Sequence, residues 1–194
     1  MTLMRAILAI AALALLAACA VEKGGKAHEI EAVRHVSDTP PSIAIVSMVN
    51  RNNGRAAHTA LIVNGSERVI YDPAGTFEYD AMVERGDVHY GATDRAVEYF
   101  ERYHARFAYF VHVQEFRVSA EVAELALQRT RAQGPAPQAF CTMHTTAILK
   151  DLPGFERLGR TFFPESLRKQ AARLPGVIDR YRIEEDREKA IPAG

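Results

Sequence analysis

The first half of the chain carries three apolar stretches that predict an antiparallel sheet. Residues 42–49 are apolar at almost every position, as is typical of a strand buried on both faces. We expect a second strand over residues 57–63 and a third over residues 68–71. The turn formers of residues 50–54 and a loop that begins with Asn64-Gly65 separate them. Strands with such short connections lie side by side, so the pattern predicts an antiparallel meander.

The middle of the chain changes from the period of a strand to that of a helix. Thr93-Asp94 offers an N-cap for a helix that ends near residue 106. On its apolar face, His104 is expected to pack among aromatic residues as part of the core. The apolar pattern of residues 108–118 then predicts another strand.

Helical patterns dominate the rest of the chain. Ser119 is a typical N-cap, and the helix that it begins is expected to end at Gln133. The residues expected to face inward on this helix are Val122, Leu125 and Ala126. Further expected elements are a helix that opens at Cys141, a helix that begins within residues 163–166 and a strand over residues 177–183. The whole pattern predicts an α+β fold, in which helices pack on a small antiparallel sheet.

The N-terminal segment has the pattern of an export signal. Arg5 precedes an apolar run of 13 residues that is too short to cross a bilayer as a helix. The run ends in Leu16-Ala17-Ala18-Cys19, which resembles the lipobox of bacterial lipoproteins. In a lipobox, a peptidase cuts before a cysteine that carries a diacylglycerol anchor. We therefore expect residues 1–18 to be a lipoprotein signal peptide and Cys19 to be lipidated, with a plain secretory signal as the alternative.

The predicted lipoprotein signal also determines the expected location of the protein and the limits of its domain. The residue after Cys19 is Ala20. In enterobacteria, an aspartate at this position retains a lipoprotein in the inner membrane. The absence of aspartate here favours a lipid anchor in the outer membrane, on the periplasmic side of the envelope. Residues 19–41 are rich in charged and small residues and are expected to form a tether, or else an ordered N-terminal arm. The folded domain is then expected over residues 42–183, with a flexible tail over residues 184–194.

Charge and composition narrow the class of protein. Lysine plus arginine and aspartate plus glutamate both number 24 in 194 residues, so the whole chain has no net charge. No block of like charges stands out, which argues against a nucleic-acid partner. A hydrophobic content of 48% is enough for the core of one ordinary domain.

Cys141 is the only thiol expected in the folded body, because Cys19 belongs to the export signal. It follows the breaker Gly134-Pro135-Ala136-Pro137 and opens a predicted helix. The free N–H groups and the positive dipole end of a first turn stabilise a thiolate. A thiol without a disulfide partner in an oxidising compartment is either buried or used. Cys141 is therefore a candidate nucleophile, with a small buried apolar residue as the alternative.

A thiol nucleophile is usually served by a histidine that a polar group orients. Of the seven histidines, His58 heads the second predicted strand, and Asp72 ends the third. A hairpin centred on Asn64-Gly65 places these two residues near one another across the ladder. Asp72 is equally well explained as the first residue of a turn before proline. His144 shares a helix face with Cys141 and is the weaker candidate base.

The order of these motifs resembles a known family. A histidine at the start of a strand (Ala57-His58-Thr59-Ala60-Leu61) is followed by an acid at the end of the next strand (Tyr71-Asp72-Pro73) and, much later, by a cysteine that opens a helix (Phe140-Cys141-Thr142). This resembles the circularly permuted branch of the NlpC/P60 papain-like superfamily, which includes the YiiX-like and lecithin:retinol acyltransferase-like proteins. Ordinary papain-like enzymes place the cysteine before the histidine. The likeness covers roughly residues 58–149 and departs after the cysteine, where an acid often follows in the family.

The resemblance implies a permuted papain-like fold and a cysteine hydrolase or acyltransferase that acts on amide or ester bonds. Cys141 would be the nucleophile, His58 the base and Asp72 the orienting residue. The implied substrate is a peptidoglycan-derived peptide or a related acyl amide or ester. No cofactor is expected, and no metal, because His58, Asp72 and Cys141 lack zinc-type spacing. The alternatives are a non-catalytic papain-like binding lipoprotein and a lipid-directed thiol acyltransferase or esterase.

Overall fold

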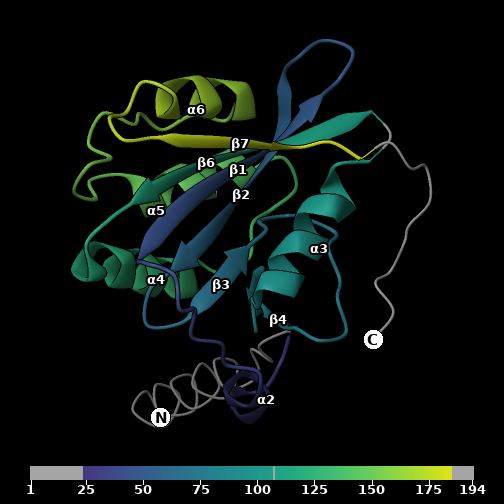
Figure 1. The fold of residues 1–194 in the computed structure, drawn as a ribbon, viewed down its shortest axis with the longest axis vertical. Coiled ribbons are helices and arrows are strands. Elements are labelled where there is room, and N and C mark those ends of the chain that lie inside the picture. Colours follow the sequence, from purple (N-terminus) through teal and green to yellow (C-terminus); the bar gives the residue numbers. More distant parts are fainter. Residues whose placement is uncertain (1–23, 107, 185–194) are drawn as a thin grey trace, which may run out of the picture.

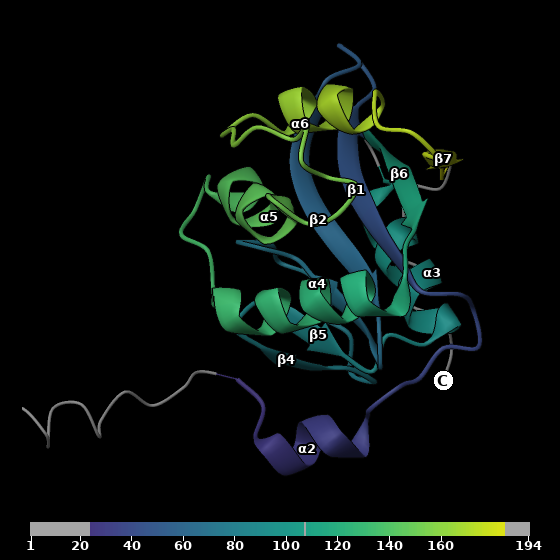
Figure 2. The ribbon, with the colours of Figure 1, turned by 90° about the vertical axis from the view of Figure 1, so that its left-hand side faces the viewer.

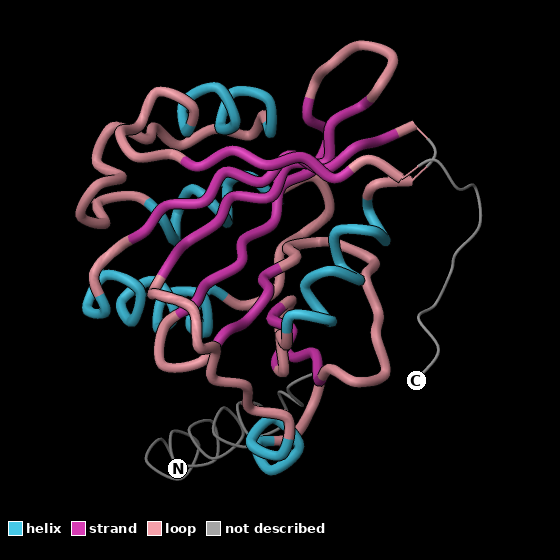
Figure 3. Tube along the Cα trace, viewed as in Figure 1, coloured by secondary structure: helices cyan, strands magenta, loops and turns pink. Residues whose placement is uncertain are grey.

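A seven-stranded antiparallel sheet forms the centre of the computed structural model, which describes residues 24–106 and 108–184 (Figure 1). The order of its strands is β4-β5-β3-β2-β1-β6-β7. Their bounds are Ser42–Asn50 for β1, Ala56–Asn64 for β2, Arg68–Tyr71 for β3, Val83–Arg85 for β4, Val88–Tyr90 for β5, Tyr109–Arg117 for β6 and Ile178–Arg182 for β7. The predicted meander of the first three strands is confirmed. The β1–β2 turn stands clear of the sheet (Figure 3).

The strands β4 and β5 extend the sheet beyond β3 and carry no clear period in the sequence. Each has three residues, and Arg85 pairs with Val88 around a two-residue loop. The loop residues Gly86 and Asp87 have φ angles of 62° and 65°. Two successive left-handed residues are what a tight type I′ hairpin needs. Strands this short are below the length at which alternation can be recognised.

Helices cover both faces of the sheet (Figure 2). The helix α3 lies on one face, and α4, α5 and α6 lie on the other. Their bounds are Asp94–His104 for α3, Ala120–Gln133 for α4, Cys141–Leu149 for α5 and Pro164–Ala171 for α6. The expected caps are confirmed: Thr93 accepts from the N–H of Ala96, and Ser119 accepts from that of Val122. The arrangement confirms the predicted α+β class.

Side chains of the central strands alternate between two separate hydrophobic cores, one on each face of the sheet. Ile43 and Ile45 of β1 pack with α4, α5 and α6, whereas Ala44 and Val46 pack with α3. The first core is closed by Leu127 and by Ile148 and Leu149, and Phe100 anchors the second. Because strand side chains alternate, one strand that is buried on both faces reads as a continuous apolar run.

The prediction that Leu125 faces the core is wrong. Leu125 of α4 is 37% exposed, and the buried residues of this helix are Ala123, Ala126, Leu127 and Thr130. Those four positions recur at the spacing of one helix face, and Leu125 lies about 200° round the helix from Ala123. The helix therefore packs through Leu127 and three smaller residues, and Leu125 points outward.

The described part of the N-terminal segment forms an ordered arm, which was the alternative to a tether. Residues 24–41 include the helix α2 at Ala27–Ala32. The N–H of Gly25 donates to the carbonyl of Glu84 in β4, and the side-chain amide of Asn64 donates to the carbonyl of Pro40. The arm is thus held by a backbone group of the edge strand β4 and by a side chain of β2.

The expected signal peptide and Cys19 lie outside the described residues, as does the tail beyond residue 184. In residues 24–106 and 108–184, no helix is both long enough and apolar enough to span a bilayer.

Candidate active site

The structure brings together the three residues that the sequence singles out. His58 lies near the start of β2, Asp72 follows β3 directly, and Cys141 is the first residue of α5. Nε2 of His58 lies 2.7 Å from Oδ1 of Asp72. The His58 ring also lies close enough to the Cys141 thiol for each group to shift the pKa of the other. Because Nε2 faces Asp72, Nδ1 is the ring nitrogen left to serve the thiol.

The β2–β3 register explains why His58 and Asp72 meet. Leu61 pairs with Tyr71, which places Asp72 opposite Ala60. His58 is two residues from Ala60 and shares its face, so His58 and Asp72 are diagonal neighbours. The predicted proximity across the hairpin is confirmed.

Cys141 reaches His58 at the point where β3 ends. The strand β2 begins at Ala56, but its pairing with β3 extends only from Asn64 to Leu61. The backbone of Thr59 is therefore beyond the end of β3, and it lies near enough to the Cys141 sulfur to help lower the pKa of the thiol. The side chain of Thr142 lies 3.7 Å from the same sulfur. The short strand β3 leaves the edge of β2 open for the start of α5.

The charges in this group favour a thiolate and an imidazolium. Burial alone lowers the pKa of His58, but the hydrogen bonds and charges of Asp72 and Cys141 outweigh it and raise the pKa to about 10. Burial alone raises the pKa of Cys141, yet the His58 contact brings it below its usual value. The pKa of Asp72 is also lowered, because His58 outweighs the burial of the carboxyl. The three groups therefore hold their charges together.

The start of α5 offers unused N–H donors beside the thiol. The first intrahelical bond runs from the N–H of His144 to the carbonyl of Phe140. The N–H groups of Cys141 and Thr142 precede that bond, so they have no intrahelical partner. Phe140 caps the helix without a side-chain hydrogen bond. These N–H groups can donate hydrogen bonds to an oxygen near the sulfur and so stabilise the negative charge that develops on it.

A second histidine, His104 of α3, borders the carboxylate of Asp72. Its Nε2 lies 4.0 Å from Oδ2 of Asp72, an oxygen that is buried and has no hydrogen-bond partner in the described structure. Nδ1 of His104 lies 2.9 Å from the carbonyl of Phe100, so the neutral ring carries its proton there. Burial lowers the pKa of His104 to about 4. The sequence indicates a packed core residue, which His104 is, but does not reveal that it lies against Asp72.

Asp87, which the sequence does not single out, ties the two halves of the site together. One of its oxygens, Oδ2, accepts from the N–H of Ala74 at 2.8 Å and from that of Ala136 at 2.7 Å. Ala74 belongs to the turn after Asp72, and Ala136 belongs to the loop before Cys141. The backbone carbonyl of Asp87 also accepts from the N–H of Asp72. Only the tight hairpin between β4 and β5 brings Asp87 to this position.

His144 has a different set of partners from Cys141. Its Nδ1 lies 3.1 Å from the hydroxyl of Tyr71 and 3.2 Å from the side-chain amide of Gln133. The Tyr71 hydroxyl donates to the carbonyl of Gly134. The side chain of His144, in the first turns of α5, therefore packs against the end of α4. His58 is the histidine that lowers the pKa of the thiol.

A pocket of about 350 Å³ opens beside His58 on the face that carries α3. His58 is 22% exposed through its side chain, whereas Cys141 is only 7% exposed. In the described part of the chain, no three histidine, cysteine, aspartate or glutamate residues form a group that could hold a metal ion.

Comparisons with known proteins add no relative. The chain matches no model of a known protein family. No curated protein matches it, and no solved structure does. The case for a function therefore rests on the residues of the chain and on their geometry.

Proposed function

We propose that this protein is a cysteine hydrolase with Cys141 as nucleophile, His58 as base and Asp72 as the residue that orients His58. One observation carries the proposal: Nε2 of His58 lies 2.7 Å from the Asp72 carboxylate, and the same ring lies close enough to the thiol at the start of α5 to lower its pKa. This is the arrangement that activates a thiol nucleophile. It also supports the permuted papain-like fold, in which the cysteine helix follows the strands.

The proposed mechanism uses only groups of this site. The Cys141 thiolate attacks the carbonyl carbon of an amide, and the N–H groups at the start of α5 stabilise the oxyanion. His58 gives its proton to the leaving nitrogen as the C–N bond breaks, which leaves a thioester on the sulfur. His58 then takes a proton from water, the hydroxide oxygen bonds to the acyl carbon, and the C–S bond breaks. Asp72 keeps the ring oriented and supports its positive charge.

The proposed substrate is a cell-wall peptide amide or a related acyl compound. This rests on the lipobox at Leu16-Ala17-Ala18-Cys19, which directs a protein to the bacterial envelope. With a lipid on Cys19, the domain faces the periplasm and favours the outer membrane. Peptide amides of the wall are the acyl compounds that a site in this compartment meets.

An exposed aromatic cluster favours acyl esters as a second substrate class. Phe140, adjacent to Cys141, is 40% exposed and packs edge-on against Phe162 with ring centroids 5.3 Å apart. Phe163 is 68% exposed. Aromatic rings beside the nucleophile can cover an apolar acyl chain. A preference for long-chain over acetyl esters that is lost in Phe162→Ala would support an esterase, and equal turnover of both would reject it.

Alkylation of Cys141 tests the hydrolase. The full chain is treated with iodoacetamide, and modification of Cys141 is followed by peptide mass spectrometry, which separates it from Cys19. We expect rapid alkylation at pH 7 that falls at least ten-fold in His58→Ala and is unchanged in the matched control His144→Ala. Cys141→Ala should then abolish turnover of peptide substrates. A slow thiol, equal in all three proteins, would instead indicate a non-catalytic binding lipoprotein.

A further inference from the structure

The pocket beside His58 is enclosed by three parts of the fold. Met48 and His58 come from β1 and β2, the turn residues 74–76 follow Asp72, and Tyr103 comes from α3. Arg106, which follows α3, and Tyr109, the first residue of β6, complete the wall. The pocket is thus built around the base of the proposed site, and its walls are largely aromatic and apolar.

The chemistry of a thiol hydrolase decides which part of a substrate this pocket holds. The acyl group bonds to the sulfur, and the leaving group receives its proton from the histidine. His58 lines the pocket, whereas Cys141 does not. A substrate whose carbonyl carbon lies at the sulfur therefore places its leaving group in the pocket. The acyl part extends away from it, toward Phe140.

Arg106 gives the pocket a fixed positive charge. Its Nε donates to the carbonyl of Tyr103 at 2.5 Å, and its guanidinium carbon lies 4.2 Å from the centroid of the Tyr103 ring. These two contacts hold the group in place. Among the described residues, no carboxylate pairs with Arg106, so its two terminal amino groups are available to a ligand.

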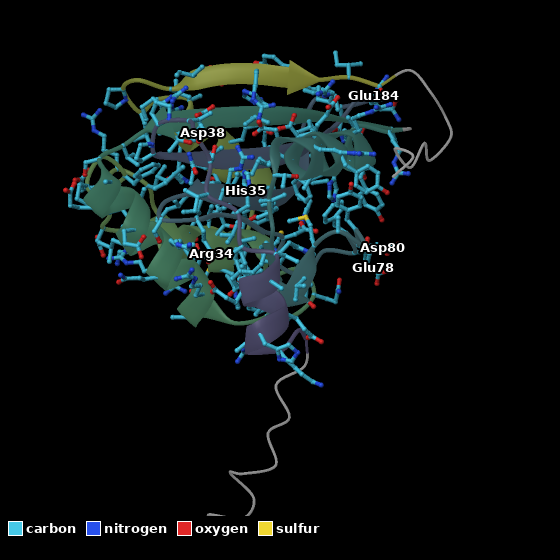
Figure 4. All side chains as sticks on the ribbon, turned by 60° about the horizontal axis from the view of Figure 1, so that its bottom comes forward. Arg34, His35, Asp38, Glu78, Asp80 and Glu184 are labelled. Carbon is cyan, nitrogen blue, oxygen red and sulfur yellow. The ribbon has the colours of Figure 1, made fainter. Side chains whose placement is uncertain are left out.

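The rest of the lining does not compensate this charge. No aspartate or glutamate lines the pocket, and burial lowers the pKa of His104 to about 4, so this neighbour is neutral at pH 7. The acids Glu78 and Asp80 line an adjoining recess of about 440 Å³, which shares Gly75 and Thr76 with the pocket, and they lie together at the edge of the molecule (Figure 4). A fixed guanidinium without an anionic partner matches a carboxylate, which it can bind with two parallel hydrogen bonds.

We propose that the leaving group of the substrate carries a free carboxylate and that Arg106 binds it. This inference rests on the proposed function and names its substrate class. The bond cleaved joins an acyl group to the nitrogen of an amino acid or short peptide with an unblocked C-terminus. Attack by Cys141 forms the C–S bond and breaks the C–N bond, and His58 supplies the proton of the departing amine. Water then releases the acyl group as a carboxylate.

Matched ligands test the proposal without turnover. Alanyl-alanine and alanyl-alanine amide mimic a leaving group and differ only in the terminal carboxylate. Each is titrated into the full chain carrying Cys141→Ala, with binding followed by calorimetry. We expect the carboxylate form to bind at least about ten-fold more tightly, as a charge-assisted hydrogen bond predicts. In Arg106→Gln the two ligands should bind equally, and Arg106→Lys should keep part of the preference.

Arg102 supplies the control, because it lies one turn earlier on α3 and pairs with Glu184 instead of lining the pocket. Arg102→Gln should leave the preference unchanged. The same weak affinity for both ligands, or a preference that persists in Arg106→Gln, would overturn the proposal. Alkylation of Cys141 reports on the hydrolase separately, so failure of the thiol chemistry is distinguishable from failure of the carboxylate site.

Discussion

Gly75 packs directly on the carboxylate of Asp72, and no Cβ fits between them. A methyl group built on Gly75 would overlap both oxygens and the carboxyl carbon of Asp72. Oδ2 is therefore covered by backbone on this side, with His104 on another. The position of the orienting carboxylate thus depends on a residue that has no side chain.

Gly75→Ala should consequently damage the site without touching any of its three functional groups. The new methyl group has to displace Asp72 from His58, so we expect alkylation of Cys141 to slow at least about ten-fold. Gly159→Ala is the control, because its Cβ would meet only the flexible end of Gln170 at 3.5 Å. Equal alkylation rates in both variants would show that Asp72 does not act through its position against Gly75.

The pH dependence of alkylation should report on Asp72. A hydrogen bond and the charge of Asp72 help to raise the pKa of His58 to about 10, and His58 in turn lowers the pKa of Cys141. In the unmodified protein, the rate should rise with pH through a midpoint below the ordinary thiol value of ~8.5. In Asp72→Asn, the imidazolium is less stable and the midpoint should move upward. An unchanged midpoint would remove Asp72 from the site.

Asp87 should act as a positioning residue. Asp87→Ala leaves the half-buried N–H groups of Ala74 and Ala136 without their acceptor, which costs about 0.5–1.5 kcal/mol for each lost hydrogen bond. We expect both a lower free energy of unfolding and slower alkylation of Cys141. Asp87→Asn keeps an acceptor oxygen and tolerates the φ of 65°, so it should restore most of both properties. Slow alkylation in the asparagine variant would contradict a purely positional role.

Glu165 should stabilise the protein in a pH-dependent way. Burial raises its pKa, but hydrogen bonds from Arg168 and from the N–H of Ala56 outweigh this and lower the pKa to about 2. A lowered carboxyl pKa gives stability that is present above the unfolded pKa and is lost as the pH falls through the folded pKa. Glu165→Gln should therefore cost on the order of 2 kcal/mol at pH 7, with some loss to solvent screening.

The measurement for Glu165 is denaturant unfolding at pH 7 and near pH 2. The difference between the unmodified protein and Glu165→Gln should shrink at the lower pH. Near pH 2 the carboxyl is protonated in the unfolded state and about half protonated in the folded state, so little of its charge-dependent stabilisation remains. Glu98→Gln, on the exposed side of α3, should show little difference at either pH. A Glu165 difference that is constant with pH would mean that packing, not charge, is responsible.

The sequence predicts the His58–Asp72 half of the site because local rules determine it. Turn residues fix the β2–β3 hairpin, and the period of a strand fixes the shared face. The approach of Cys141 is harder to predict, since it depends on β3 being shorter than β2. A few residues at a strand end decide that length, and no periodic pattern marks it.

Asp87 and His104 show what sequence patterns leave out. Asp87 acts from a hairpin whose strands have three residues each, too few to show alternation. His104 has the helical spacing of a core residue, but that spacing does not indicate that the Asp72 carboxylate lies beside its ring. The prediction for Leu125 is wrong for a related reason. The elements that surround a helix determine which of its faces is buried, and an apolar side chain alone does not.

The arm of residues 24–41 limits how far the domain can move from a lipid on Cys19. Backbone hydrogen bonds attach Gly25 to the edge strand β4. Only the five residue steps between Cys19 and Gly24 precede this attachment, and a fully extended chain of that length reaches about 18 Å. With the proposed anchor in place, the domain therefore lies close to the bilayer surface. The proposed hydrolase, held by the proposed anchor, would therefore act only on substrates within that distance of the bilayer.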